Sequence, residues 1–125
     1  MSVARRVSET LCCGLLLSAC SGGPEQKLVG TWDSEASDRL NHLELRADGS
    51  LSGAVHKVDF VGNKISLGHY AGSWRFLRGH LNLLIVESDV QGLAAGYASS
   101  DEILELTDHQ LLVRSATGHE ENWQR

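Results

Sequence analysis

The chain is poor in the residues that cross-link small extracellular domains or bind nucleic acids. It has one proline, three cysteines and 6% aromatic residues among its 125 positions. All three cysteines lie in the first 20 positions, so residues 21–125 can form no disulfide and no cysteine metal site. Lysine and arginine number 11 against 16 aspartates and glutamates, a formal net charge of −5. Because nucleic-acid binding needs a basic surface, this balance argues against it.

The first 19 residues have the pattern of an export signal. Arg5 and Arg6 give a positively charged start, residues 11–17 form a short apolar run, and small residues precede Cys20. The apolar run is shorter than the roughly 20 residues that a membrane-spanning helix needs. We therefore predict a signal peptide over residues 1–19 rather than a membrane span.

The tetrad Leu17-Ser18-Ala19-Cys20 resembles the lipobox of bacterial lipoproteins. A cysteine thiol is the nucleophile that can take a diacylglyceryl group, and small residues before it give a peptidase access to the bond. The resemblance implies that Cys20 becomes an acylated N-terminus and that the membrane is a partner of the protein. The alternative is a soluble secreted protein that is cleaved elsewhere.

Ser21, which follows the lipobox cysteine, resembles the residue choice of lipoproteins that are sorted to the outer membrane. The resemblance implies a lipid-anchored protein of the cell envelope that faces the periplasm. Residues 20–27 are polar and contain glycine and proline, so we expect them to form a flexible tether.

From residue 28 onward the sequence predicts an all-β domain of the size of one compact unit. Apolar and polar residues alternate, and turn signals recur every 8–12 residues or so, as in sandwiches and barrels. We expect strands near 28–33, 41–47, 51–60, 64–70, 71–77, 80–87, 94–106, 110–115 and 119–124.

An open meander of short strands leaves two exposed edges, and closing the sheet removes them. Closure pairs the first strand, which carries Trp32, with the last, which carries Trp123. We therefore predict a small antiparallel β-barrel of about eight strands over residues 28–125, with both indoles inside.

One hairpin can be predicted to its register. If Arg78 and Gly79 form a two-residue turn, the facing pairs place apolar residues or glycine on one side of the sheet, and a one-residue slip would invert the whole set. The predicted pairs are Phe76 with Leu81, Trp74 with Leu83 and Gly72 with Ile85.

Four segments in this order resemble the small bacterial lipocalin-like domains. They are 28–32 (LVGTW), the turn at 47–49 (ADG), 72–74 (GSW) and 79–83 (GHLNL). The resemblance covers residues 28–125 and implies a barrel that holds side chains or one small apolar ligand. The Thr-Asp-Tyr loop and the C-terminal helix of true lipocalins are not visible in the sequence.

The resemblance also implies how the barrel closes at one end. In lipocalins a glycine two residues before the first-strand tryptophan forms the signature, and an arginine from a late strand stacks over that tryptophan. Here Gly30 and Trp32 match the signature, and Arg114 or Arg125 supplies the arginine. Together with Trp123 these residues are the candidates for barrel closure.

Six further residues are candidates either for the core or for the wall of a ligand cavity: Trp32, Trp74, Phe76, Leu83, Ile85 and Tyr97. The segment 88–97 is rich in small residues and lies where a barrel mouth could be covered. It is either a lid or a plain connection with a glycine bend.

No catalytic or metal motif is present in the sequence. The histidines (His42, His56, His69, His80, His109 and His119) form no His-x-His pair, so we predict no metal and no cofactor. The adjacent carboxylates Asp101-Glu102 and Glu120-Glu121 point to opposite faces of a strand, so neither pair forms an acid–base dyad by spacing alone. We predict that the protein is not an enzyme.

Two function classes remain for the domain. The first is a non-catalytic envelope lipoprotein whose barrel binds a small apolar ligand or helps to maintain the envelope. The second is a module that binds a protein partner, either as a protease inhibitor or as a pilotin-type chaperone of secretion machinery. An exposed apolar groove would favour the chaperone role.

Overall fold

Eight antiparallel strands close into a barrel in the computed structural model, which describes residues 23–125. The predicted signal peptide, the lipobox and Cys20 lie outside the described residues. The elements are α1 (Pro24–Leu28), β2 (Gly30–Ala36), β3 (Arg39–Leu45), β4 (Ser50–Val58), β5 (Lys64–Leu77), β6 (His80–Ser88), β7 (Ala98–Leu106), β8 (Gln110–Arg114) and β9 (Glu120–Gln124).

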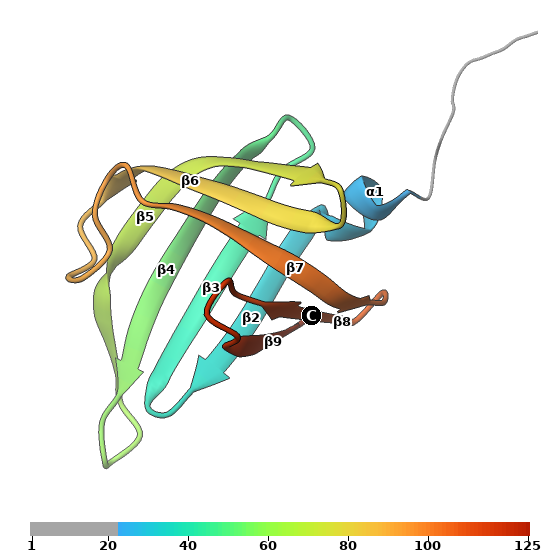
Figure 1. Cartoon of the computed structure of the whole chain (residues 1–125). Helices are drawn as coiled ribbons and strands as arrows, with labels where there is room; N and C mark the ends of the chain where they lie inside the picture. Colours follow the sequence, from blue (N-terminus) through green and yellow to red (C-terminus); the bar gives the residue numbers. More distant parts are fainter. Residues whose placement is uncertain (1–22) are drawn as a thin grey trace, which may run out of the picture.

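The strands follow one another around the barrel in chain order, and β2 pairs with β9 to close it (Figure 1). The predicted meander barrel of about eight strands is therefore confirmed. Two strand predictions are wrong in detail, because 64–70 and 71–77 form the single long strand β5. Its pairing with β6 shifts register between Ala71 and Gly72, an irregularity that lets the long strand bend without ending.

The predicted hairpin between β5 and β6 is confirmed to its register. Phe76 faces Leu81 and Trp74 faces Leu83 across the two strands. Arg78 and Gly79 both have positive φ, 53° and 79°, as a type I′ turn requires. The turn matches the right-handed twist of the flanking strands, and the alternation then places Trp74 and Leu81 in the core.

Residues 24–27, the last part of the expected tether 20–27, are helical and belong to α1. Pro24 begins the helix at a position where its missing N–H costs no hydrogen bond. Leu28 ends the helix and is completely buried, so the segment is held by a hydrophobic contact. No helix among residues 23–125 is long and apolar enough to cross a membrane.

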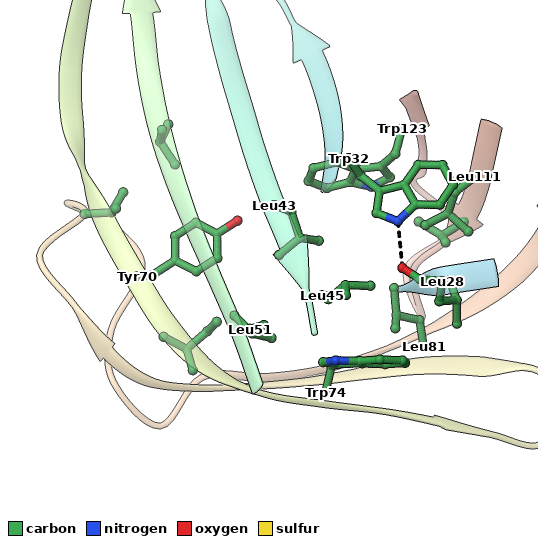
Figure 2. Close-up of a cluster of buried hydrophobic side chains, with 14 residues drawn as sticks. Leu28, Trp32, Leu43, Leu45, Leu51, Tyr70, Trp74, Leu81, Leu111 and Trp123 are labelled. Carbon is green, nitrogen blue, oxygen red and sulfur yellow. Dashed lines mark hydrogen bonds between the residues drawn. The ribbon is translucent and has the colours of Figure 1, made fainter. Parts of the chain in front are cut away.

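One end of the barrel is filled by a hydrophobic core, and we call it the closed end. Trp32 is completely buried there, and its Nε1 donates a hydrogen bond of 2.9 Å to the carbonyl oxygen of Leu28 (Figure 2). Trp74 donates in the same way to the carbonyl oxygen of Arg46 at 2.8 Å. Leucines from several strands pack around them: Leu43, Leu45, Leu51, Leu81 and Leu111.

Arg125 seals the closed end from outside. Its guanidinium carbon lies 4.0 Å from the centre of the Trp32 ring. The side chain donates hydrogen bonds to the carbonyl oxygens of Lys27, Val29 and Asp108 at 2.7, 2.8 and 2.8 Å. It thereby ties the start of the described chain to its last residue and to the β7–β8 turn.

Gly30 leaves the space that the guanidinium of Arg125 occupies. A Cβ at this position would lie 2.7 Å from Nη1 of Arg125, and its φ of +136° is one that other residues rarely adopt. Arg114 instead lies on the outside of the barrel and donates to Glu102 at 2.7 Å. The structure thus places Arg125, rather than Arg114, over Trp32.

Replacing Arg125 with Ala should lower the free energy of unfolding by about 1–3 kcal/mol, because charged hydrogen bonds and a cation–π contact are lost together. Arg114→Ala removes the same charge from an exposed ion pair and should have a much smaller effect. Urea denaturation followed by circular dichroism measures both variants. Equal effects of the two substitutions would show that Arg125 does not hold the closed end together.

Candidate ligand-binding site

A cavity of about 270 Å³ lies inside the barrel, on the side of the core away from α1. At this end, the mouth, the chain turns between β2 and β3, β4 and β5, β6 and β7, and β8 and β9. The cavity is lined by Asn41, Leu43, Tyr70, Leu81, Leu83, Ile85, Leu93, Tyr97, Ser99, Asp101, Val113, Ser115, His119, Glu121 and Trp123.

The lining changes from apolar to polar along the barrel axis on five strands. On each of them, the inward residue nearer the closed end is apolar and the inward residue two positions nearer the mouth is polar. The pairs are Trp32 and Ser34, Leu43 and Asn41, Ile103 and Asp101, Val113 and Ser115, and Trp123 and Glu121. We call Ser34, Asn41, Asp101, Ser115 and Glu121 the polar belt.

The remaining three strands, β4, β5 and β6, give the barrel a mostly apolar interior wall. Leu83 and Ile85 on β6 line the cavity. Tyr70 on β5 lies with its ring over Gly53, where any Cβ would collide with the ring. Its hydroxyl reaches across to the belt and donates to Oδ1 of Asn41 at 2.8 Å. The cavity thus has one apolar side and one polar side.

Asp101 and Glu121, the two carboxyls of the polar belt, are the acidic groups that line the cavity. Burial raises the pKa of Glu121, although its Oε2 accepts a hydrogen bond of 3.2 Å from the hydroxyl of Ser34. The Asp101 carboxylate also raises the pKa of Glu121, so the two groups feel each other's charge. Burial raises the pKa of Asp101 as well.

Tyr70 stays protonated at neutral pH in this environment. Burial, followed by the nearby charge of Glu121, raises the pKa of its hydroxyl to about 12. Its proton is therefore available for the hydrogen bond to Asn41, and the ring is held against the apolar wall.

The segment between β6 and β7 covers part of the mouth. Val90 is buried and Leu93 packs against the core. The carboxylate of Asp89 accepts a hydrogen bond of 2.6 Å from the backbone N–H of His69 on β5, which fixes the start of the segment. The predicted segment 88–97 thus folds over the barrel opening, while Tyr97 lines the cavity and stays about half exposed.

The candidate lining residues predicted from the sequence fall into two groups. Leu83, Ile85 and Tyr97 line the cavity. Trp32 and Trp74 are buried in the closed-end core, and Phe76 packs against it, so these three do not face the cavity. Trp123, which the sequence marked only for barrel closure, lines the cavity floor.

Two larger hollows open elsewhere on the barrel. One, of about 620 Å³, is lined mainly by outward residues of β3, β4 and β5, and the other, of about 600 Å³, by residues of β2, β3 and β9. Both are more open to solvent than the interior cavity. Within residues 23–125 no group of three or more His, Cys, Asp or Glu side chains is placed to hold a metal ion.

Comparison with solved structures agrees with this architecture. A lipocalin-like protein from Bacteroides uniformis superposes with a TM-score of 0.56 at 14% sequence identity, covering 79% of this chain and 98% of the other. The chain has a lipocalin-like fold. A protein from Bacteroides eggerthii gives a TM-score of 0.55 at 10% identity, covering 78% and 98%. No protein-family model and no curated protein sequence matches the chain.

Proposed function

We propose that this lipocalin-like chain is a lipid-anchored binding protein of the bacterial cell envelope, without catalytic activity. The observation that carries the proposal is the interior cavity of about 270 Å³. Its volume is slightly below the range of about 300–1,000 Å³ that is usual for drug-sized ligands. An eight-stranded barrel has room for one small ligand, so the proposed ligand is a single small molecule.

The polar groups of the cavity support binding rather than catalysis. The Tyr70 hydroxyl is engaged with Asn41, and Glu121 accepts from Ser34. These contacts hold the side chains in fixed positions around the space. Fixed polar groups beside an apolar wall are the usual composition of a binding pocket.

The proposed anchor is Cys20, at the end of the tetrad Leu17-Ser18-Ala19-Cys20. Ser21 after it favours the outer membrane, with the domain in the periplasm. A single acyl chain binds membranes only marginally, and stable anchoring takes a second hydrophobic signal. The three chains of a bacterial lipoprotein meet that requirement.

An alternative function, binding of a protein partner, is supported by the β4–β5 loop. Phe60 is fully exposed and Val61 is two-thirds exposed at its tip. The loop is held in shape by Asp59, whose carboxylate accepts from the backbone N–H groups of Val61 and Asn63 at 3.0 and 2.8 Å. A fixed apolar tip is a feature of interaction surfaces.

The binding proposal is tested by filling the cavity. Ser99 faces the cavity, whereas Ser100 is its exposed neighbour on the same strand. Ser99→Phe should lower the affinity for 1-naphthylmethanol at least tenfold, and Ser100→Phe should leave it unchanged. Isothermal titration calorimetry with the full-length chain in a non-ionic detergent measures both, with protein-free micelles as the blank.

Equal affinity of the two phenylalanine variants, or absence of binding by the alcohol, by 1-naphthylmethylamine and by 1-naphthoate, would contradict ligand binding in the barrel. That result would favour the partner-binding alternative. Circular dichroism shows whether Ser99→Phe keeps the strand content of the unmodified protein.

A further inference from the structure

The distribution of charge around the cavity is one-sided. Two carboxyls, Asp101 and Glu121, belong to the polar belt, and among residues 23–125 no lysine or arginine side chain lines the interior cavity. Arg39 lines an adjoining hollow at the mouth, but among the described residues it forms no ion pair with either carboxyl. His119 is exposed and is the one histidine among the described lining residues; its charge acts on Glu121, and the charge of His80 acts on Asp101.

Asp101 is the less satisfied of the two carboxyls. It lies half-buried inside the barrel, opposite Leu81 on β6. Within residues 23–125, no hydrogen bond or ion pair reaches its carboxylate, whereas its neighbour Glu102 on the outer face is paired with Arg114. A carboxylate that loses water without gaining a donor is destabilised. A ligand that brings a positive charge or several N–H donors would remove this deficit.

The apolar wall lies beside these carboxyls. Leu83 and Ile85 on β6 and Leu93 and Tyr97 from the mouth segment line the same cavity as the belt. A molecule that fills the cavity therefore meets hydrocarbon on one side and carboxylates on the other. A purely apolar ligand would bury Asp101 and Glu121 further without compensating their charge, at a free-energy cost.

We propose that the ligand is a small amphipathic cation, whose ammonium or similar group lies between Asp101 and Glu121 and whose apolar part contacts Leu83, Ile85 and Tyr97. This inference rests on the proposed binding function and adds the chemical class of the ligand. Charge-assisted hydrogen bonds from the ammonium group supply the donors that the described residues do not give to Asp101.

Three compounds with the same ring and different charge test the inference: 1-naphthylmethylamine, 1-naphthylmethanol and 1-naphthoate. Isothermal titration calorimetry at pH 7 with the full-length chain in non-ionic detergent should show that the amine binds at least tenfold more tightly than the alcohol. The naphthoate should bind more weakly than the alcohol.

Removing either carboxyl should remove this preference. Asp101→Asn and Glu121→Gln should each lower the affinity for the amine about tenfold, while the affinity for the alcohol changes less than about twofold. The matched control is Glu120→Gln, which removes one charge from the exposed neighbour of Glu121 on β9 and should leave the affinity for the amine unchanged.

Loss of binding in these variants should not come from unfolding. Because burial disfavours the charged form of Glu121, the folded protein loses stability as the pH rises through the raised pKa of this group. At pH 7 the neutral Glu121→Gln variant should therefore melt no lower than the unmodified protein, as circular dichroism can show.

The outcomes separate the two proposals. If the alcohol or the naphthoate binds as tightly as the amine, or if the amine binds the carboxyl variants unchanged, the cationic ligand class is overturned and the binding function stands. If none of the three compounds binds, the binding function is overturned, and the ligand class with it.

Discussion

Replacing Trp32 with Ala should lower the free energy of unfolding by about 3–5 kcal/mol. The side chain is completely buried at the closed end, where it contacts the core, donates to Leu28 and lies under Arg125. The substitution removes all three interactions and leaves a cavity. Since domains of this size have a net stability of about 5–15 kcal/mol, the variant should unfold at a much lower urea concentration, measured by circular dichroism.

The matched control is another aromatic residue in the opposite environment. Phe60 is fully exposed at the tip of the β4–β5 loop, so Phe60→Ala should leave the urea midpoint unchanged. If Trp32→Ala unfolded at the same midpoint as the unmodified protein, Trp32 would not be a core residue and the description of the closed end would be wrong.

Replacing Cys20 with Ser should abolish acylation and release the protein from the outer membrane. The serine hydroxyl cannot form the thioether on which lipoprotein processing depends. Each buried CH₂ of an acyl chain contributes about 0.8 kcal/mol to membrane binding, so loss of all the chains should move nearly all of the protein out of the outer-membrane fraction. Metabolic labelling with palmitate and membrane fractionation measure the two effects.

Cys12 and Cys13 provide the control within the same segment. Cys12→Ser and Cys13→Ser should keep both the fatty-acid label and the membrane association. A Cys20→Ser protein that still carried the label, or that stayed in the outer membrane, would contradict the lipobox interpretation.

The fold was predictable from the sequence because short-range rules decide most of it. The alternation of apolar and polar residues selects the buried face of each strand, and the Arg78-Gly79 turn determines the register between β5 and β6. The helix α1 could not be predicted in this way, since five residues are too few to show a helical period. It exists because Leu28 completes the core.

The choice between Arg114 and Arg125 depends on where the two strands end. Arg114 ends β8 at the mouth and points outward, whereas Arg125 follows β9 at the closed end, where it reaches Trp32. The lining of the cavity likewise depends on the position of each residue along the barrel. Trp123 belongs to the core and also lines the cavity, whereas Trp74 belongs to the core and does not line it.

The acidic residues show what the alternation of side chains along a strand can predict and what it cannot. Alternation places Asp101 and Glu102 on opposite faces of β7, and Glu120 and Glu121 on opposite faces of β9, so neither adjacent pair forms a dyad. The structure places one member of each pair, Asp101 and Glu121, in one cavity. Their meeting depends on β7 and β9 lying two strands apart in a closed barrel, which is a long-range property. The signal in the sequence was a polar residue two positions from a buried one on several strands.

If Cys20 carries the proposed acyl chains, the position of α1 determines how the barrel is oriented on the membrane. The helix lies at the closed end, opposite the β4–β5 loop (Figure 1). Three residues lie between Cys20 and Pro24, and the four steps from one to the other span at most roughly 13–14 Å when extended. With acyl chains on Cys20, the plugged base of the barrel stays next to the bilayer and its opening points to the aqueous compartment. A ligand would then enter the barrel from the aqueous compartment rather than directly from the bilayer.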